Sequence, residues 1–253
     1  MQIDESYCAL VNRWIEYAIE SNVKELNLSN ICPPKYSQVP KSVLVAKSIT
    51  KLTLCFCNLK SLPNDINLSS LKKLVVGRVY MEDQNFQNLI AGCLVVEEIK
   101  FEHCKGLKNI CVSGLPKLMV IELVNNFELE SVEIEASNLK SLLANFVNPS
   151  PIFNLLPCEN LKNLALYSAN VTDKWLHDLL SKNPLIQSLD LNCCKMLKTI
   201  NISSDRIQNL TFNRCRALIE VNIATPKLHR LKYFGNRKSF SSNTSTFSVV
   251  SSF

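Results

Sequence analysis

Glycine is scarce in this chain of 253 residues, where only five occur and no two lie close enough to form a phosphate-cradling loop. The G-x-S-x-G elbow of hydrolases and the H-E-x-x-H motif of zinc proteases are also missing. No run of 18 apolar residues is present, and the N-terminus lacks the basic start and apolar core of a secretory signal. We therefore expect a non-enzymatic protein with no cofactor and no membrane contact, located in the cytoplasm or the nucleus.

Cysteine pairs of the C-x-x-C type are absent too, although the chain has eleven cysteines. A structural zinc site needs four converging ligands, and the three histidines are far apart in the sequence. An odd number of scattered cysteines fits no secreted disulfide framework. We predict free thiols, without a metal site or a disulfide.

The chain does contain a repeated pattern, L-x-x-L-x-L-x-x-[NC], in which other apolar residues can replace leucine. Ten copies start 21 to 26 residues apart, which is within the period of about 20–29 residues of leucine-rich repeats. The copies begin at Val23, Ile49, Leu71, Val96, Leu118, Leu139, Leu161, Ile186, Ile207 and Leu228.

The spacing within the pattern predicts a strand that only neighbouring repeats can bury. The fourth and sixth positions are two residues apart, so their side chains point to one face of a strand. One unit cannot bury this face alone, whereas stacked units share a continuous core. The sequence therefore predicts an α/β leucine-rich-repeat solenoid, or horseshoe, of about ten repeats with a parallel sheet on the concave face.

The convex side is predicted to mix short strands and helices. Residues 81–93 and 171–183 carry apolar stripes at helical spacing, and Thr172 or Asp173 can cap the second helix. Four other repeats continue with a second alternating apolar set, which predicts short strands. These sets are Leu107/Ile110/Val112, Leu129/Val132/Ile134, Leu197/Ile200/Ile202 and Leu218/Val221/Ile223.

Three regions are predicted along the chain. Residues 1–22 form a capping helix that protects the first strand, residues 23–236 form the repeat domain, and the Ser-rich residues 237–253 form a disordered tail. The stripe expected to face the first strand consists of Tyr7, Leu10, Val11, Trp14, Ile15, Ala18 and Ile19.

The ninth position of the repeat explains one of the adjacent cysteines Cys193 and Cys194. A small side chain at this position lies under the turn and can bond to loop backbone, and cysteine is small and readily buried. Cys194 occupies the ninth position, while Cys193 is expected toward the concave rim. The other residues expected at ninth positions are Cys57, Cys104, Asn126, Cys215 and Asn236.

The outward positions of the concave strands are the candidate surface for binding a target protein. Their composition changes from charged residues to amides and a tyrosine, which suits protein recognition by aromatic anchors and hydrogen bonds. A merely soluble inner surface explains the same residues about equally well, and His103 could instead titrate against Glu102. The candidate residues are Glu98, Lys100, Glu102, His103, Glu122, Asn145, Tyr167, Asp190, Asn192 and Asn213.

The net charge of +6 is unevenly distributed. Residues 206–238 contain eight Lys or Arg against one acid. Such a basic segment suits an acidic partner or nucleic acid. No nucleic-acid motif accompanies it, so a solvated face is the favoured interpretation and no nucleic acid partner is expected.

Several segments resemble the leucine-rich region of plant F-box/LRR proteins of the RNI-like, FBD-associated type. NRWIEYAIESNVKELNLSN supplies a tryptophan-bearing helix and the N-V-K-E-L strand, and SITKLTLCFCNLKSLP follows it. SSLKKLVVGRVYMEDQNFQNLIAGCLVVEEIKFEHCKGLKNI supplies the S-L-K-x-L strand and a helix that begins near an aspartate. VTDKWLHDLLSKNPLIQSLDLNCC is similar in the same way, and the resemblance covers residues 4–236.

This resemblance implies a substrate receptor of an SCF-type ubiquitin ligase, whose repeats hold a target while an F-box binds a Skp-type adaptor. About twenty residues precede Val23 and supply one helix, whereas an F-box needs several. A Skp-type adaptor is therefore expected only for a longer form that carries an F-box. A stand-alone repeat scaffold, a receptor that competes for targets without transferring ubiquitin, and an extracellular receptor fragment remain alternatives.

Overall fold

The computed structural model describes residues 5–29, 38–147, 150–155, 158–235, 239–242 and 249–251. The chain divides into two compact units, residues 1–130 and 131–253. No helix in the described ranges is long and apolar enough to cross a membrane.

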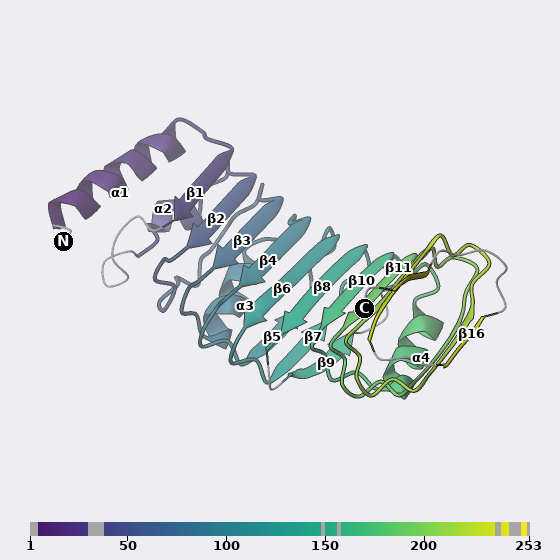
Figure 1. Ribbon diagram of the computed structural model, residues 1–253. Coiled ribbons are helices and arrows are strands. Elements are labelled where there is room, and N and C mark those ends of the chain that lie inside the picture. Colours follow the sequence, from purple (N-terminus) through teal and green to yellow (C-terminus); the bar gives the residue numbers. More distant parts are fainter. Residues whose placement is uncertain are drawn as a thin grey trace. The chain divides into compact units, whose positions relative to one another are not determined.

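In the first unit five parallel strands lie side by side in the order β1-β2-β3-β4-β6 (Figure 1). Equal positions of successive repeats pair, so Leu52 of β2 lies beside Leu74 of β3 and both are fully buried. The elements are α1 (Glu5–Glu20), β1 (Glu25–Ser29), α2 (Lys41–Leu44), β2 (Lys51–Cys55), β3 (Lys73–Gly77), α3 (Asp83–Ala91), β4 (Glu98–Glu102), β5 (Asn109–Val112) and β6 (Val120–Asn126).

The second unit has a concave sheet of order β8-β10-β11-β13-β15-β17, a convex sheet β12-β14-β16 and a convex pair β7-β9. Leu164, Leu189 and Leu210 pair across β10, β11 and β13, as the repeat register predicts. The strands are β7 (Ser131–Ile134), β8 (Ser141–Phe146), β9 (Ile152–Leu155), β10 (Asn163–Tyr167), β11 (Ser188–Asn192), β12 (Thr199–Ser203), β13 (Asn209–Asn213), β14 (Glu220–Ala224), β15 (Arg230–Phe234), β16 (Ser239–Ser242) and β17 (Val249–Ser251), and the helix is α4 (Asp173–Lys182). Both units are thus built from leucine-rich repeats.

The predicted mixture of convex elements is confirmed. β5, β7, β12 and β14 are the four expected short strands, and α3 and α4 are the two expected helices. Thr172 is the N-cap of α4, because its Oγ1 accepts a hydrogen bond from the Trp175 N–H at 3.2 Å. Asp173 instead bonds to the next repeat, where its carboxylate accepts from the backbone N–H groups of Lys198 and Thr199.

The ninth position holds buried side chains that bond to backbone, as predicted. The Cys215 thiol donates to the Leu191 carbonyl at 3.4 Å, and Cys57 makes the equivalent bond to Leu28 at 3.3 Å. Asn126 does more: its Nδ2 donates to the Phe101 carbonyl at 3.1 Å, and its Oδ1 accepts from the Cys104 N–H at 2.9 Å. Asn236 lies outside the described residues.

The eighth position adopts a left-handed backbone, which the sequence did not indicate. Seven residues there have φ between 51° and 57°, and for six of them the N–H donates to the seventh-position carbonyl of the next repeat at 2.7–3.1 Å. Cys193 is one of them, so its place beside Cys194 reflects two repeat positions with different backbone roles. The seven residues are Phe56, Arg78, His103, Asn125, Ser168, Cys193 and Arg214.

Both ends differ from the expectation. Val11 and Ile15 of α1 are buried, but Leu10 and Trp14, which were predicted on the same face, are 42% and 58% exposed. In the segment expected to be a disordered tail, β16 pairs with β14 and β17 pairs with β15, so strands extend beyond residue 236. That α1 protects the first strand stays a prediction.

Candidate functional site: the outward residues of the concave strands

In the first unit the outward charges form ion pairs with one another. Lys100 of β4 lies 2.8 Å from Glu102 and 3.6 Å from Glu122 of β6, and Glu98 pairs with Lys73 of β3. The hydrogen bond to Glu102 raises the pKa of Lys100. The predicted residues Lys100, Glu102 and Glu122 therefore form one ion-pair network, and Glu98 belongs to a separate pair.

Close packing at this network depends on a glycine that the sequence analysis did not single out. A Cβ on Gly77 would lie 3.0 Å from the Glu102 side chain and 3.1 Å from the Cys55 sulfur. The absence of that atom lets the Glu102 side chain lie across β3. A glycine inside a strand pattern can signal such a close approach.

His103 is not part of the ion-pair network. Its backbone is left-handed directly after the end of β4, and its N–H donates to the Val124 carbonyl at 2.9 Å. Its ring contacts Phe127, with 5.8 Å between ring centroids. Among the described residues His103 therefore contacts an aromatic ring, and its place in the candidate binding surface stays a prediction.

In the second unit the predicted residues gather around one carboxylate. Tyr167 of β10 donates from Oη to Asp190 Oδ2 of β11 at 3.2 Å, and Asn192 Nδ2 donates to Asp190 Oδ1. Burial raises the pKa of Asp190 despite these two hydrogen bonds and the charge of Lys232. Burial and the neighbouring carboxylate likewise raise the pKa of Tyr167.

The remaining predicted residues continue the same row of seventh positions. Asn145 pairs in register with Tyr167, and Asn192 pairs with Asn213. Asn145 and Asn213 are half-buried, so each can present its amide. Asn192 is only 5% exposed and positions Asp190, which differs from the expected role as a direct contact.

The described residues contain no group of three or more His, Cys, Asp or Glu side chains that could hold a metal ion. Their cysteines are free thiols, and burial raises the pKa of Cys57 to about 11 and that of Cys104 to about 12. A thiol with such a pKa is protonated at neutral pH, so it is a poor nucleophile and metal ligand. Around Asp190 the concave strands offer hydrogen bonding, the aromatic ring of Tyr167 and a half-buried carboxylate.

Comparison with known proteins connects this repeat architecture to one family. The model of the LRR repeats of FBD-associated F-box protein At5g56370 matches residues 11–151, and that of the LRR domain of At1g61320/AtMIF1 matches residues 145–251.

Three relatives from Arabidopsis thaliana show how much is shared. F-box/LRR-repeat protein At3g03360 is 25% identical over 52% of the chain and 28% of its own length. Putative F-box/FBD/LRR-repeat protein At4g00315 is 30% identical over 51% of the chain and 31% of its own length. F-box/LRR-repeat protein At1g55660 is 31% identical over 51% of the chain and 37% of its own length.

The matched part therefore spans about a third of the length of these relatives. The first family model alone covers more than half of the chain, and its matched range includes the strands β1 to β8. The chain belongs to the leucine-rich-repeat family of the plant FBD-associated F-box proteins.

Proposed function

We propose that the chain binds a target protein on its concave strands and is the substrate-recognition part of an F-box/LRR receptor of an SCF-type ubiquitin ligase. The observation that carries the proposal is Asp190. Burial raises its pKa, so keeping it charged at neutral pH costs folding free energy. Core packing does not require a carboxylate on the outward side of β11, whereas recognition of a hydrogen-bond donor does.

The chemistry of the second unit suits a polar target surface. Tyr167 supplies an aromatic ring of the kind that dominates many interfaces, and the amides of Asn145 and Asn213 can both donate and accept. Asp190 would accept from a basic or amide group of the target. In the first unit, Glu98, Lys100, Glu102, His103 and Glu122 would set orientation and selectivity more than affinity, since most of them are already ion-paired.

Several further assignments belong to the same proposal. The repeats work as a binding surface and not as a catalyst, in the cytoplasm or the nucleus, without nucleic acid or a membrane as partner. Residues 1–22 serve as a cap and 23–236 as the recognition domain. A Skp-type adaptor is a partner only in a longer form with an F-box, the domain for which the relatives are named.

Proximity biotinylation in plant cells tests the binding part. Asp190→Lys should remove labelling of the target, while the control Glu133→Lys should keep it, because Glu133 is exposed on the convex strand β7 and its replacement changes the charge equally. The labelled target protein is then purified, and its affinity for the wild type, for Asp190→Lys and for Glu133→Lys is measured by calorimetry. Equal affinity of Asp190→Lys and Glu133→Lys would contradict the concave site.

A fusion tests the ligase part separately. Joining an F-box to the N-terminus should shorten the half-life of the target identified above, and the fusion with Asp190→Lys should not. If the target binds but its half-life is unchanged by either fusion, the chain acts as a stand-alone repeat scaffold.

A further inference from the structure

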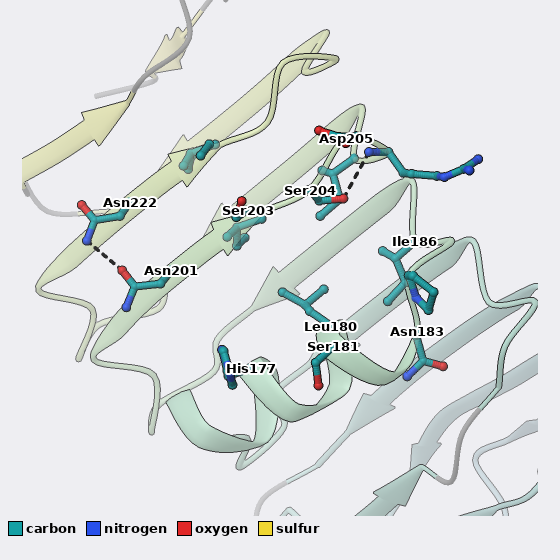
Figure 2. Close-up of a pocket in the computed structure, with 16 residues that line it drawn as sticks. His177, Leu180, Ser181, Asn183, Ile186, Asn201, Ser203, Ser204, Asp205 and Asn222 are labelled. Atoms are coloured by element: carbon teal, nitrogen blue, oxygen red, sulfur yellow. Dashed lines mark hydrogen bonds between the residues drawn. The ribbon is translucent and has the colours of Figure 1, made fainter.

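A groove of about 630 Å³ lies on the convex side of the second unit, between α4 and β12 (Figure 2). Its apolar lining includes Leu180 of α4, Ile186 and Ile202, and its polar lining includes Asn201 and Ser203 of β12. A helical repeat is followed here by a repeat with a short convex strand, and a helix is wider than a strand. The difference in width between α4 and β12 leaves the groove between them open.

One wall of the groove is the free edge of a strand. β12 is the edge strand of the sheet β12-β14-β16, and its backbone alternates between the two sides. The Lys198 carbonyl accepts from the Ile219 N–H at 2.7 Å and the Ser204 N–H donates to Ala224 at 3.1 Å, so even-numbered residues face β14. The backbone groups of Asn201 and Ser203 therefore face α4.

Only the start of this edge has a partner among the described residues. The Lys198 and Thr199 N–H groups donate to the Asp173 carboxylate at 2.8 and 3.0 Å. Farther along, the edge-facing N–H and C=O groups of Asn201 and Ser203 have no partner in the described part of the chain. They border a groove that is large enough for a ligand.

The first unit shows the same arrangement with the edge occupied. Asp83 at the start of α3 accepts from the Lys108 and Asn109 N–H groups, as Asp173 does in the second unit. One turn later, Gln87 Nε2 donates to the Cys111 carbonyl at 2.9 Å.

Counting from the two aspartates, His177 corresponds to Gln87 and Asn201 corresponds to Cys111. His177 makes no equivalent bond to the Asn201 carbonyl, and it lines the groove instead (Figure 2). Substitution at one helix position thus leaves a backbone acceptor available in the second unit.

The charge of the second unit indicates what kind of chain would approach. Residues 1–130 contain 14 Lys or Arg and 14 Asp or Glu. Residues 131–253 contain 14 Lys or Arg but only 8 Asp or Glu, so the second unit carries the whole net positive charge of the chain. All seven ion pairs among the described residues lie in the first unit. Arg206 lines the groove, Lys182 is the last residue of α4, and Lys198 directly precedes β12. All three are exposed, and none has an ion-pair partner among the described residues.

We propose that the groove binds an extended, acidic segment of a partner protein, which pairs as an added strand with the free edge of β12. A backbone N–H of the segment donates to the Asn201 carbonyl, and a backbone carbonyl accepts from the Ser203 N–H. An apolar side chain of the segment packs against Leu180 and Ile186, and its carboxylates approach Lys198 and Arg206. This surface is separate from the one around Asp190.

Fluorescence anisotropy on the full chain tests the proposal with the labelled peptide Glu-Val-Glu-Val-Thr-Val. His177→Gln supplies the amide that Gln87 provides in the first unit, so it should weaken binding about tenfold, the value of one lost hydrogen bond. The matched variant His177→Ala should bind like the wild type. His177 is exposed, so both variants are expected to fold, which melting curves verify.

A peptide with N-methyl groups on alternate residues keeps every side chain but loses backbone donors, and it should not bind detectably. Equal binding of this peptide, equal binding by His177→Gln, or equal competition by a DNA oligonucleotide of the same charge would each overturn the proposal. Asp190→Lys should leave peptide affinity unchanged. A loss with Asp190→Lys would show that the peptide uses the concave strands and would refute the groove without affecting the proposed target site.

Discussion

Replacing Asn126 with alanine should destabilise the first unit strongly, because this side chain satisfies two buried backbone groups in the neighbouring repeat. Asn126 is 4% exposed, and it donates to the Phe101 carbonyl at 3.1 Å and accepts from the Cys104 N–H at 2.9 Å. Alanine leaves both groups without a partner. Each buried unsatisfied group costs about 1–3 kcal/mol, so the free energy of unfolding should fall by about 2–6 kcal/mol.

Asn126→Cys is the informative comparison, because cysteine occupies the ninth position in other repeats. A thiol at this site can donate to the Phe101 carbonyl, as Cys215 does to Leu191 at 3.4 Å, but it leaves the Cys104 N–H unpaired. We therefore expect the stability order wild type, then Asn126→Cys, then Asn126→Ala. The cysteine variant should lose about half as much free energy as the alanine variant.

Urea denaturation followed by circular dichroism measures these differences, and thermal melting gives a second estimate. About 2–4 °C is lost per kcal/mol in a chain of this size, so Asn126→Ala should melt about 8–16 °C lower for a loss of about 4 kcal/mol. The exposed residue Asn12 provides the control Asn12→Ala. An Asn126→Ala variant within about 0.5 kcal/mol of the wild type, or one more stable than Asn126→Cys, would refute the reasoning.

Four further predictions concern the core, two carboxylates and the thiols. Leu189 is 1% exposed, so Leu189→Asp should abolish cooperative melting by burying an unpaired charge; an unchanged curve would show that the repeat register is wrong. Burial raises the pKa of Asp190, so the stability of the wild type falls as the pH rises through that folded pKa. Asp190→Asn should therefore have a higher melting temperature than the wild type at pH 7, and a lower melting temperature of the variant would contradict this. Burial opposes ionisation of Asp83, but hydrogen bonds from Asn109 and Lys108 outweigh it and lower the pKa of Asp83. The ionised carboxylate therefore stabilises the fold above the unfolded pKa of about 4, and this stabilisation is lost as the pH falls through the folded pKa. Asp83→Asn should flatten the acid side of the stability profile, measured by melting from pH 2 to 7. Iodoacetamide should label the exposed Cys111 long before the buried thiols, as peptide mass spectrometry would reveal, and early labelling of ninth-position cysteines would contradict their burial. The buried thiols among the described residues are Cys57, Cys93, Cys104, Cys158, Cys194 and Cys215.

The sequence by itself determined the repeat register and the type of most elements. Apolar residues occupy the fourth and sixth positions of the repeat, and the repeat recurs at a near-constant period. Because side chains two residues apart in a strand lie on the same face, this pattern buries one face of each strand. The stripes in residues 81–93 and 171–183 have the different period of a helix, so α3 and α4 were predictable as well. Local periodicity was sufficient here because each pattern lies within a single repeat.

Only the tertiary structure decided how each repeat uses its neighbours. The contact of His103 with Phe127 and the exposure of Trp14 depend on side chains or elements outside the local pattern. The open edge of β12 depends on whether a helix residue reaches the backbone of the following repeat, as Gln87 does and His177 does not. The contacts of His103 with Phe127 and of Gln87 with Cys111 join residues more than twenty positions apart. Their geometry follows from the stacking of the repeats, which no single motif encodes.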